Sequence, residues 1–357
     1  MTSHHDEIME RIGLGGDLGF TQEAVVVLEE AVRLADAAED HQLGFLARDQ
    51  LMWATAFTGH YDKLIVAFTW CLAKVDRFPD EFDAENLLDR YKWVIEILVH
   101  FPNVSRRQIF SFLDDFRSRS VKAGFTQRSP LFLQWCAEMQ MGNLKNALET
   151  HALWRDTRRD ALADCLGCEY NRDVELCVVQ GQHELAICKA APILQGKVAC
   201  AEIPHLTYAT LLRSYQALGN HEAAKSAHDK GYRLVRRNQD FVREQAWHLD
   251  YLVEIGDIEK AVELLRRHLP MSMEIVALDF RLEFLLATRR LLHRLQEKNI
   301  HCLRTRIPQR LCPVAGKGSV NVADLEKWVE AQVEGLAAQF DARNGNTCYA
   351  ERLRLEN

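Results

Sequence analysis

Apolar residues recur every three to four positions along most of the chain, and short polar breaks interrupt them at regular intervals. Before Gly219, for example, the apolar positions are Leu211, Leu212, Tyr215 and Leu218. This spacing places the apolar side chains on one face of an amphipathic helix. The pattern therefore predicts an all-α chain of short helices that are joined by tight turns.

The polar breaks share a sequence, in which a glycine and a polar residue are followed by an alanine five positions after the glycine. They read Gly142-Asn-Leu-Lys-Asn-Ala147, Gly181-Gln-His-Glu-Leu-Ala186, Gly219-Asn-His-Glu-Ala-Ala224 and Gly256-Asp-Ile-Glu-Lys-Ala261. Successive glycines in these four breaks lie 39, 38 and 37 residues apart. Upstream, Phe101-Pro102, Gly59 and Gly19 continue the series at similar spacing. We therefore expect seven turns, near residues 19, 59, 101, 142, 181, 219 and 256.

The residues of this break suit a turn between two helices. Glycine adopts the left-handed conformation that ends a helix at little cost. Asn or Asp after the glycine can begin the next helix, and a small alanine lets two helix backbones approach closely. Evenly spaced turns of this kind should make paired helices stack side by side.

Two of the breaks resemble a known repeat. The segments Gly256-Asp-Ile-Glu-Lys-Ala261-Val-Glu-Leu-Leu265 and Gly219-Asn-His-Glu-Ala-Ala224 are similar to the inter-helix turn of tetratricopeptide repeats. The resemblance covers roughly residues 19–270 and implies a right-handed α-solenoid of stacked helical hairpins. The chain departs from that family in its period, which is longer than about 34 residues, and in lacking most of the family's first-helix Trp and Gly.

The carboxyl-terminal part follows a different pattern. After the repeat array at 1–270, which Pro270 is expected to end, residues 271–306 predict an additional long helix, and prolines and glycines at 307–319 predict a linker. Residues 320–357 predict a capping helix and tail, begun by Asn321 or Asp324. We expect its apolar stripe to cover the last repeat, although it could dock on a second copy instead. The stripe consists of Leu325, Trp328, Val329, Val333, Leu336, Ala337 and Phe340.

Composition narrows the class of protein. A chain of 357 residues exceeds the usual size of a single core, but a repeat array needs only contacts between neighbours. The chain contains no run of about 18 apolar residues, so we expect no membrane span. The acidic amino terminus lacks the basic and then apolar segments of a secretory signal. Ten scattered cysteines are typical of reduced core residues rather than of a disulfide framework. We therefore expect a cytoplasmic protein.

Charge is distributed unevenly along the chain. The net charge is −7, yet residues 1–100 hold 19 acidic and 8 basic side chains, and residues 281–317 hold nine basic and two acidic ones. This polarity could steer a charged partner, or set contacts between the terminal repeats of two copies. Solvated helix faces explain the basic segment better than a nucleic-acid site does.

Motifs that could carry chemistry are weak. Cys165 and Cys168 form the only CxxC, and without a second pair they are expected to be structural thiols rather than a metal or redox site. The glycines of residues 13–19 are predicted to form a flexible lead-in to the first helix rather than a dinucleotide loop. The segment 315–319 is assigned to the linker rather than to a phosphate loop. We therefore expect no catalytic residue, no cofactor and no metal.

The remaining hypothesis is a binding surface. In the resembling proteins the first helices of successive repeats line a concave groove that holds a peptide or a partner's helix. In this chain an Asn and two Arg are predicted to fall on equivalent faces of consecutive repeats, and such donors could grip a carboxylate or backbone carbonyls, although ordinary solvated residues explain the same pattern equally well. The chain is thus expected to be a protein- or peptide-binding scaffold or adaptor; a peptide- or signal-responsive regulator is the alternative, and a metal or redox protein ranks last. The corresponding positions are Asp49, Trp53, Lys92, Glu96, Phe132, Met139, Asn171, Glu175, Arg213, Gln216, Arg243 and Asp250.

Overall fold

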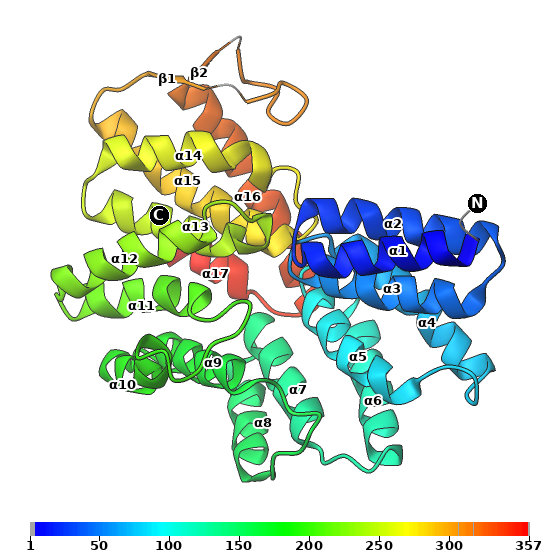
Figure 1. The fold of residues 1–357 in the computed structure, drawn as a ribbon. Helices are drawn as coiled ribbons and strands as arrows, with labels where there is room; N and C mark the ends of the chain where they lie inside the picture. Colours follow the sequence, from blue (N-terminus) through cyan, green and yellow to red (C-terminus); the bar gives the residue numbers. More distant parts are fainter. Residues whose placement is uncertain (1–3, 306, 317, 356–357) are drawn as a thin grey trace. The chain divides into compact units, whose positions relative to one another are not determined.

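The computed structural model describes residues 4–305, 307–316 and 318–355. Over these residues the regular structure consists of seventeen α-helices, one short 3-10 helix and two strands of three residues each (Figure 1). The predicted all-α class is confirmed. Within the described ranges no helix is long and apolar enough to cross a membrane.

The helices form two compact units, Met1–Ala163 and Asp164–Asn357, a division that the even spacing of the turns does not predict. The first unit contains α1 (His4–Leu18), α2 (Gln22–Ala37), α3 (His41–Ala56), α4 (Tyr61–Arg77), α5 (Ala84–Leu98), α6 (Arg106–Lys122), α7 (Arg128–Gln140) and α8 (Leu144–Asp156).

The second unit is longer and ends in a different arrangement. It contains α9 (Leu166–Val179), α10 (His183–Leu194), α11 (His205–Ala217), α12 (His221–Val235), η1 (Gln239–Phe241), α13 (Val242–Glu254), α14 (Ile258–Ser272), α15 (Leu278–Glu297), β1 (Cys302–Arg304), β2 (Ser319–Asn321), α16 (Val322–Asn344) and α17 (Cys348–Leu355).

Neighbouring helices pack as hairpins, and the hairpins stack within each unit. In the first unit α1 packs on α2 and on α3, and α5 packs on α6 and on α7. In the second unit α9 packs on α11, α11 packs on α13, and α13 packs on α15. Helices α10, α12 and α14 are the second helices of these hairpins. This adjacency confirms the predicted stack of helical hairpins.

The predicted turns lie where the sequence places them. The backbone is left-handed at each predicted turn glycine, and Phe101 lies in the connection between α5 and α6. A non-glycine residue, Glu39, takes the same conformation, with φ 55°, in the connection between α2 and α3. The turn glycines have φ between 62° and 77°: Gly19, Gly59, Gly142, Gly181, Gly219 and Gly256.

The glycine-rich segment near the amino terminus corrects one expectation. Residues 13–18 are not a flexible lead-in but the carboxyl-terminal half of α1. Gly15 is buried there, and a Cβ at this position would lie 2.5 Å from Cγ of Leu28 on α2. The absence of a side chain therefore lets α1 and α2 approach closely, and this packing offsets the low helix propensity of glycine.

We predict opposite effects of alanine at two glycines of α1. Gly15→Ala should lower the free energy of unfolding by about 1–3 kcal/mol, because its Cβ would overlap Leu28. Gly13→Ala should raise it by up to about 1 kcal/mol, because nothing lies within 4 Å of that Cβ and alanine favours the helix. Urea unfolding of both variants tests this difference; equal effects would contradict the close α1–α2 contact.

The carboxyl-terminal prediction needs two corrections. Helix α14 does not stop at Pro270 but continues to Ser272, and α15 begins only at Leu278 rather than at 271. Proline removes one hydrogen bond from the last turn of α14. The helix nevertheless continues there, with Leu269 and Ser272 buried.

Two short strands flank the predicted linker, and β1 occupies residues 302–304, which the sequence predicts as part of the long helix 271–306. Strand β1 pairs antiparallel with β2, with Leu303 opposite Val320. Asn321 then caps α16 through hydrogen bonds from the backbone of Ala323 and Asp324. Helix α16 packs on α15, and its predicted stripe is buried except for the half-buried Trp328.

Candidate functional site

The twelve predicted groove positions lie on the first helices of six hairpins. Asp49 and Trp53 are on α3, Lys92 and Glu96 on α5, and Phe132 and Met139 on α7, all in the first unit. In the second unit, pairs of these positions lie on α9 (Asn171, Glu175), α11 (Arg213, Gln216) and α13 (Arg243, Asp250).

Asp49 and Trp53 belong to a structured site. Asp49 is buried, and its carboxylate accepts two hydrogen bonds from Arg90 of α5, at 2.8 and 3.0 Å. The Arg90 guanidinium lies 4.8 Å from the ring centre of Trp53 and 4.9 Å from that of Trp93. One buried ion pair thus ties α3 to α5 and supports two tryptophan rings.

Four aromatic rings meet at this place, and we call them the aromatic patch: Phe20, Trp53, Phe57 and Trp93. Trp53 lies 4.6 Å from Trp93 and Phe20 lies 4.6 Å from Phe57, measured between ring centres. Trp53 is 36% exposed and Phe20 is 45% exposed, while Phe57 and Trp93 are half-buried. The rings therefore contact one another and solvent at the same time.

The other predicted positions of the first unit are more enclosed. Lys92 is buried and donates to the carbonyl of Leu162 at 3.0 Å. Glu96 and Met139 are half-buried, and Phe132 is a core residue that packs against Trp135 and Trp154.

In the second unit three of the predicted positions, Asn171, Glu175 and Arg243, take part in a polar network. Asn171 donates to Glu175 at 2.9 Å, and Thr207 of α11 donates to Asn171 at 2.7 Å. Glu175 also accepts from Arg172 at 2.8 Å and lies 3.9 Å from Arg243. The arginines hold the pKa of the Glu175 carboxyl below its usual value despite burial. These side chains therefore connect α9, α11 and α13.

The remaining predicted positions do not converge with this network. Arg213 is exposed and Gln216 is half-buried on α11. Asp250 pairs with Arg290 of α15 at 3.3 Å. The predicted Asn and Arg donors are therefore not equivalent: Asn171 is engaged between helices, whereas Arg213 faces solvent.

A second cluster contains three cysteines. The sulfurs of Cys165, Cys168 and Cys200 all lie within 4.8 Å of one another, and Cys168 and Cys200 are 3.6 Å apart. Cys165 is the N-cap of α9, where its sulfur accepts from the backbone of Cys168 at 3.2 Å. Hydrogen bonding from the other two thiols lowers the pKa of Cys165, and the same interaction raises the pKa of Cys168 and Cys200. Three thiol sulfurs in this arrangement could hold a soft metal ion.

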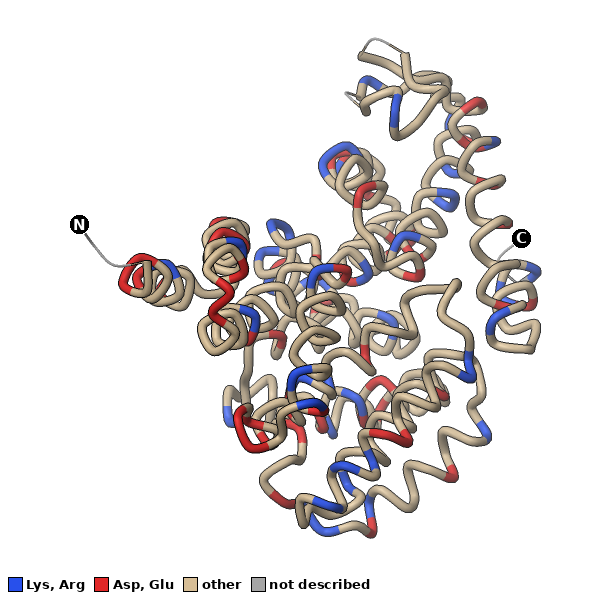
Figure 2. The backbone as a smooth tube through the Cα atoms, turned by 90° about the vertical axis from the view of Figure 1, so that its right-hand side faces the viewer, with Lys and Arg blue, Asp and Glu red and all other residues tan. Residues whose placement is uncertain are grey.

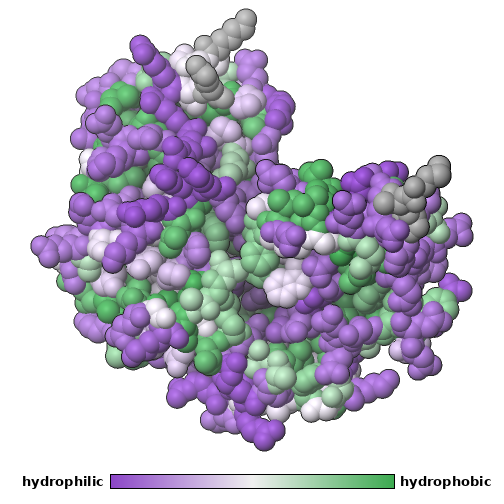
Figure 3. Space-filling view, viewed as in Figure 1, coloured by the Kyte–Doolittle hydropathy of each residue, from purple (hydrophilic) through white to green (hydrophobic). Residues whose placement is uncertain are grey.

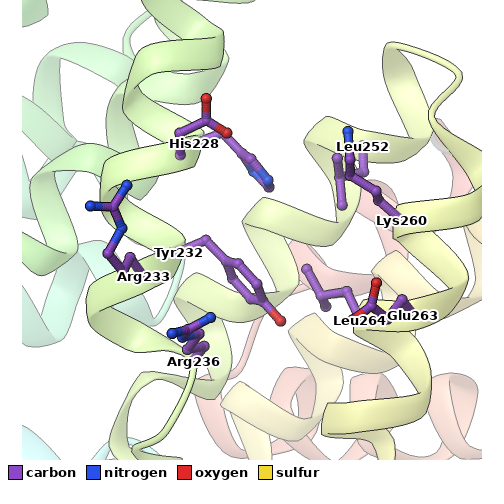
Figure 4. Close-up of a pocket in the computed structure, with 9 residues that line it drawn as sticks. His228, Tyr232, Arg233, Arg236, Leu252, Lys260, Glu263 and Leu264 are labelled. Carbon is purple, nitrogen blue, oxygen red and sulfur yellow. The ribbon is translucent and has the colours of Figure 1, made fainter.

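A cavity of about 270 Å³ lies beside α12, α13 and α14 (Figure 4). Arg233, Arg236 and Lys260 line it together with Asp229 and Glu263, and the ring of Tyr232 points from α12 towards Leu264 of α14. The lining is completed by His228, Leu252 and Leu264.

Buried histidines lie next to this cavity. Nδ1 of His228 and Nδ1 of His248 are 3.1 Å apart, and Nε2 of His268 is 2.9 Å from the Tyr232 hydroxyl. Burial lowers the pKa of His228 to about 4 and that of His268 to about 3, and it holds the pKa of His248 well below its usual value. All three rings are therefore neutral at pH 7.

Sequence reasoning missed several of these residues. Arg90 and Cys200 lie 41 and 32 residues from their partners Asp49 and Cys168, so no local pattern joins them. The sequence pattern around the buried histidines does not distinguish them from ordinary core residues or from solvent-exposed residues of a helix. Phe20 directly follows the turn glycine Gly19, and Phe57 precedes the turn glycine Gly59 by two residues. This position beside a predicted turn is the one sequence signal that could have indicated them.

No family model matches this sequence, and no curated protein matches it.

Proposed function

We propose that the chain is a scaffold or adaptor that binds a segment of another protein at the aromatic patch of the first unit. The observation that carries this proposal is a contiguous set of four aromatic rings that remains partly exposed on α3, α5 and the turn after α1. The tetratricopeptide resemblance supports the choice of first helices as the binding face.

The chemistry of the patch suits a protein partner. Tryptophan and phenylalanine offer a large apolar area with few rotatable bonds, and such residues dominate the energy of many protein interfaces. Single exposed apolar side chains are ordinary, and they reach the surface at several places on this molecule (Figure 3). Four rings that form a continuous set of ring contacts, supported by a buried ion pair, form a preorganised site.

Charge indicates which segment fits the patch. Residues 1–100 carry 19 acidic and 8 basic side chains, and acidic positions are frequent on the amino-terminal helices (Figure 2). Asp17 precedes Phe20 by three residues, and Glu96 follows Trp93 by one helical turn on α5. We therefore propose a partner segment in which an apolar side chain lies next to Lys or Arg.

A displayed library of random peptides, selected on the full chain, tests this function. Enriched peptides should combine an apolar anchor with basic residues. Trp53→Ala should weaken their binding by about 30-fold or more, since a central interface tryptophan contributes about 2 kcal/mol or more. Titration with fluorescent peptides measures the affinity.

The matched control is Val66→Ala, on the second helix α4 of the same unit. Val66 is 71% exposed and lies outside the patch, so peptide affinity should not change. Peptides that bind Trp53→Ala as tightly as the natural chain would refute the proposed site.

A further inference from the structure

We propose that Cys165, Cys168 and Cys200 bind one zinc ion through three thiolates, at the amino-terminal edge of the second unit. The three sulfurs come from two separate segments: the first turn of α9, and the loop between α10 and α11. The site is independent of the aromatic patch.

The distances suit a single ion. With a Zn–S bond of about 2.3 Å, two thiolates on a tetrahedral ion lie about 3.8 Å apart. Cys168 and Cys200 are already 3.6 Å apart, and the whole cluster falls within 4.8 Å. Bringing the three sulfurs to bonding distance therefore requires only small side-chain movements.

The loop that carries Cys200 is held in place from both sides. The backbone of Cys200 donates to the carbonyl of Ile203 at 3.1 Å, and Ile203 is buried against Gly167 of α9. Just beyond this loop, the buried hydrogen bond from Thr207 to Asn171 fixes the start of α11 against α9. The arrangement of the sulfurs is thus supported by packing that does not depend on them.

The ligand set favours zinc over harder ions. Thiolates select soft or borderline metals, whereas magnesium and calcium take oxygen ligands. Among the residues that the structure describes, no fourth His, Cys, Asp or Glu joins the group. A water molecule or another small donor would complete the tetrahedron, as at zinc sites that keep one open position.

Such an ion would stabilise one end of the helix stack within the second unit. Helix α9 is the first helix of the second unit and has a stacking neighbour within that unit on one side only. Zinc would join its amino terminus to the following α10–α11 connection. Because the metal binds the folded form, its removal should lower the melting temperature of the chain.

The test uses the full chain, purified under reducing conditions and supplied with zinc. Metal analysis should find one zinc per wild-type chain and less than one tenth as much in Cys200→Ser. The control Cys188→Ser, an exposed thiol on α10, should retain one zinc. Cobalt titration of the wild-type chain adds a readout without mutation: a thiolate-to-cobalt absorption band should saturate at one equivalent, and zinc should abolish it.

Three results would overturn the proposal. These are a wild-type chain that binds no zinc or cobalt after complete reduction, a Cys200→Ser variant that retains full zinc binding, and copper in place of zinc in the purified chain. Helix content by circular dichroism shows whether Cys200→Ser folds; where it does not, the cobalt titration decides alone.

Discussion

Replacing Asp49 by alanine is expected to lower the free energy of unfolding of the first unit by about 3–5 kcal/mol. The Arg90 guanidinium would then remain buried between α3 and α5 without its carboxylate, and breaking a buried pair by removing one partner carries a cost of this size. Arg90 is 4% exposed and makes both hydrogen bonds to the same carboxylate. Urea unfolding followed by tryptophan fluorescence measures the change.

Two variants make this expectation specific. Replacing both partners, as in Asp49→Leu with Arg90→Met, should restore most of the lost stability, because neither buried charge remains. Glu30→Ala removes an exposed pair with Arg33 and should change the free energy of unfolding very little. If Asp49→Ala were as mild as Glu30→Ala, the buried pair would not be the link between α3 and α5.

Acid is expected to destabilise the second unit through its buried histidines. An unfolded histidine gains a proton near pH 6.5, whereas His228 and His268 in the fold stay neutral down to about pH 4 and pH 3. The unfolded state therefore binds more protons as the pH falls below 6.5, and stability decreases by about 1.4 kcal/mol per pH unit for each such histidine. This contribution is fully present above pH 6.5 and is lost progressively towards pH 3–4.

A carboxyl group acts in the opposite direction. Burial, together with the charge of Asp240, raises the pKa of Glu202 to about 8, so its contribution to stability increases as the pH falls from about 8 towards 4.5. Comparison of His268→Leu with the natural chain isolates the histidine. The variant should lose less stability between pH 6 and pH 4, by about 1.4 kcal/mol per pH unit.

The matched control for the pH dependence is Leu269→Ala, a neighbouring core position of α14 that does not titrate. It should lower stability at every pH without changing the slope. Equal slopes for His268→Leu and the natural chain, measured by urea unfolding across this pH range, would show that the histidine does not stay neutral in the fold.

The turns could be predicted because their signals are local. Gly219 and Asn220 end one helix and begin the next through their own backbone preferences, and the structure confirms both roles. Glu39 gives no such signal, since a non-glycine residue takes the left-handed conformation only under the constraint of its neighbours. The prediction of a flexible lead-in around Gly15 was wrong for a similar reason. Gly15 belongs to a helix because it packs closely against Leu28, and a glycine-rich segment does not indicate this contact.

The candidate sites were less accessible to sequence reasoning. Helical spacing placed Asp49 and Trp53 on one face of a first helix, but it could not show that Arg90 buries the carboxylate and supports the ring. The CxxC at Cys165 and Cys168 gives no local sign of a third sulfur, because Cys200 lies in the connection between α10 and α11. Side-chain pairing between hairpins depends on the depth and angle of packing, which periodicity does not specify.

The central proposal is that the aromatic patch on the first helices binds a partner segment, and cross-linking tests it most directly. A selected peptide that carries a photoreactive group beside its apolar anchor should react with α3 and α5, near Trp53 and Trp93, as located by mass spectrometry of the full chain. Cross-links confined to the second helices α4 and α6, or spread over both units without preference, would contradict the proposed binding face.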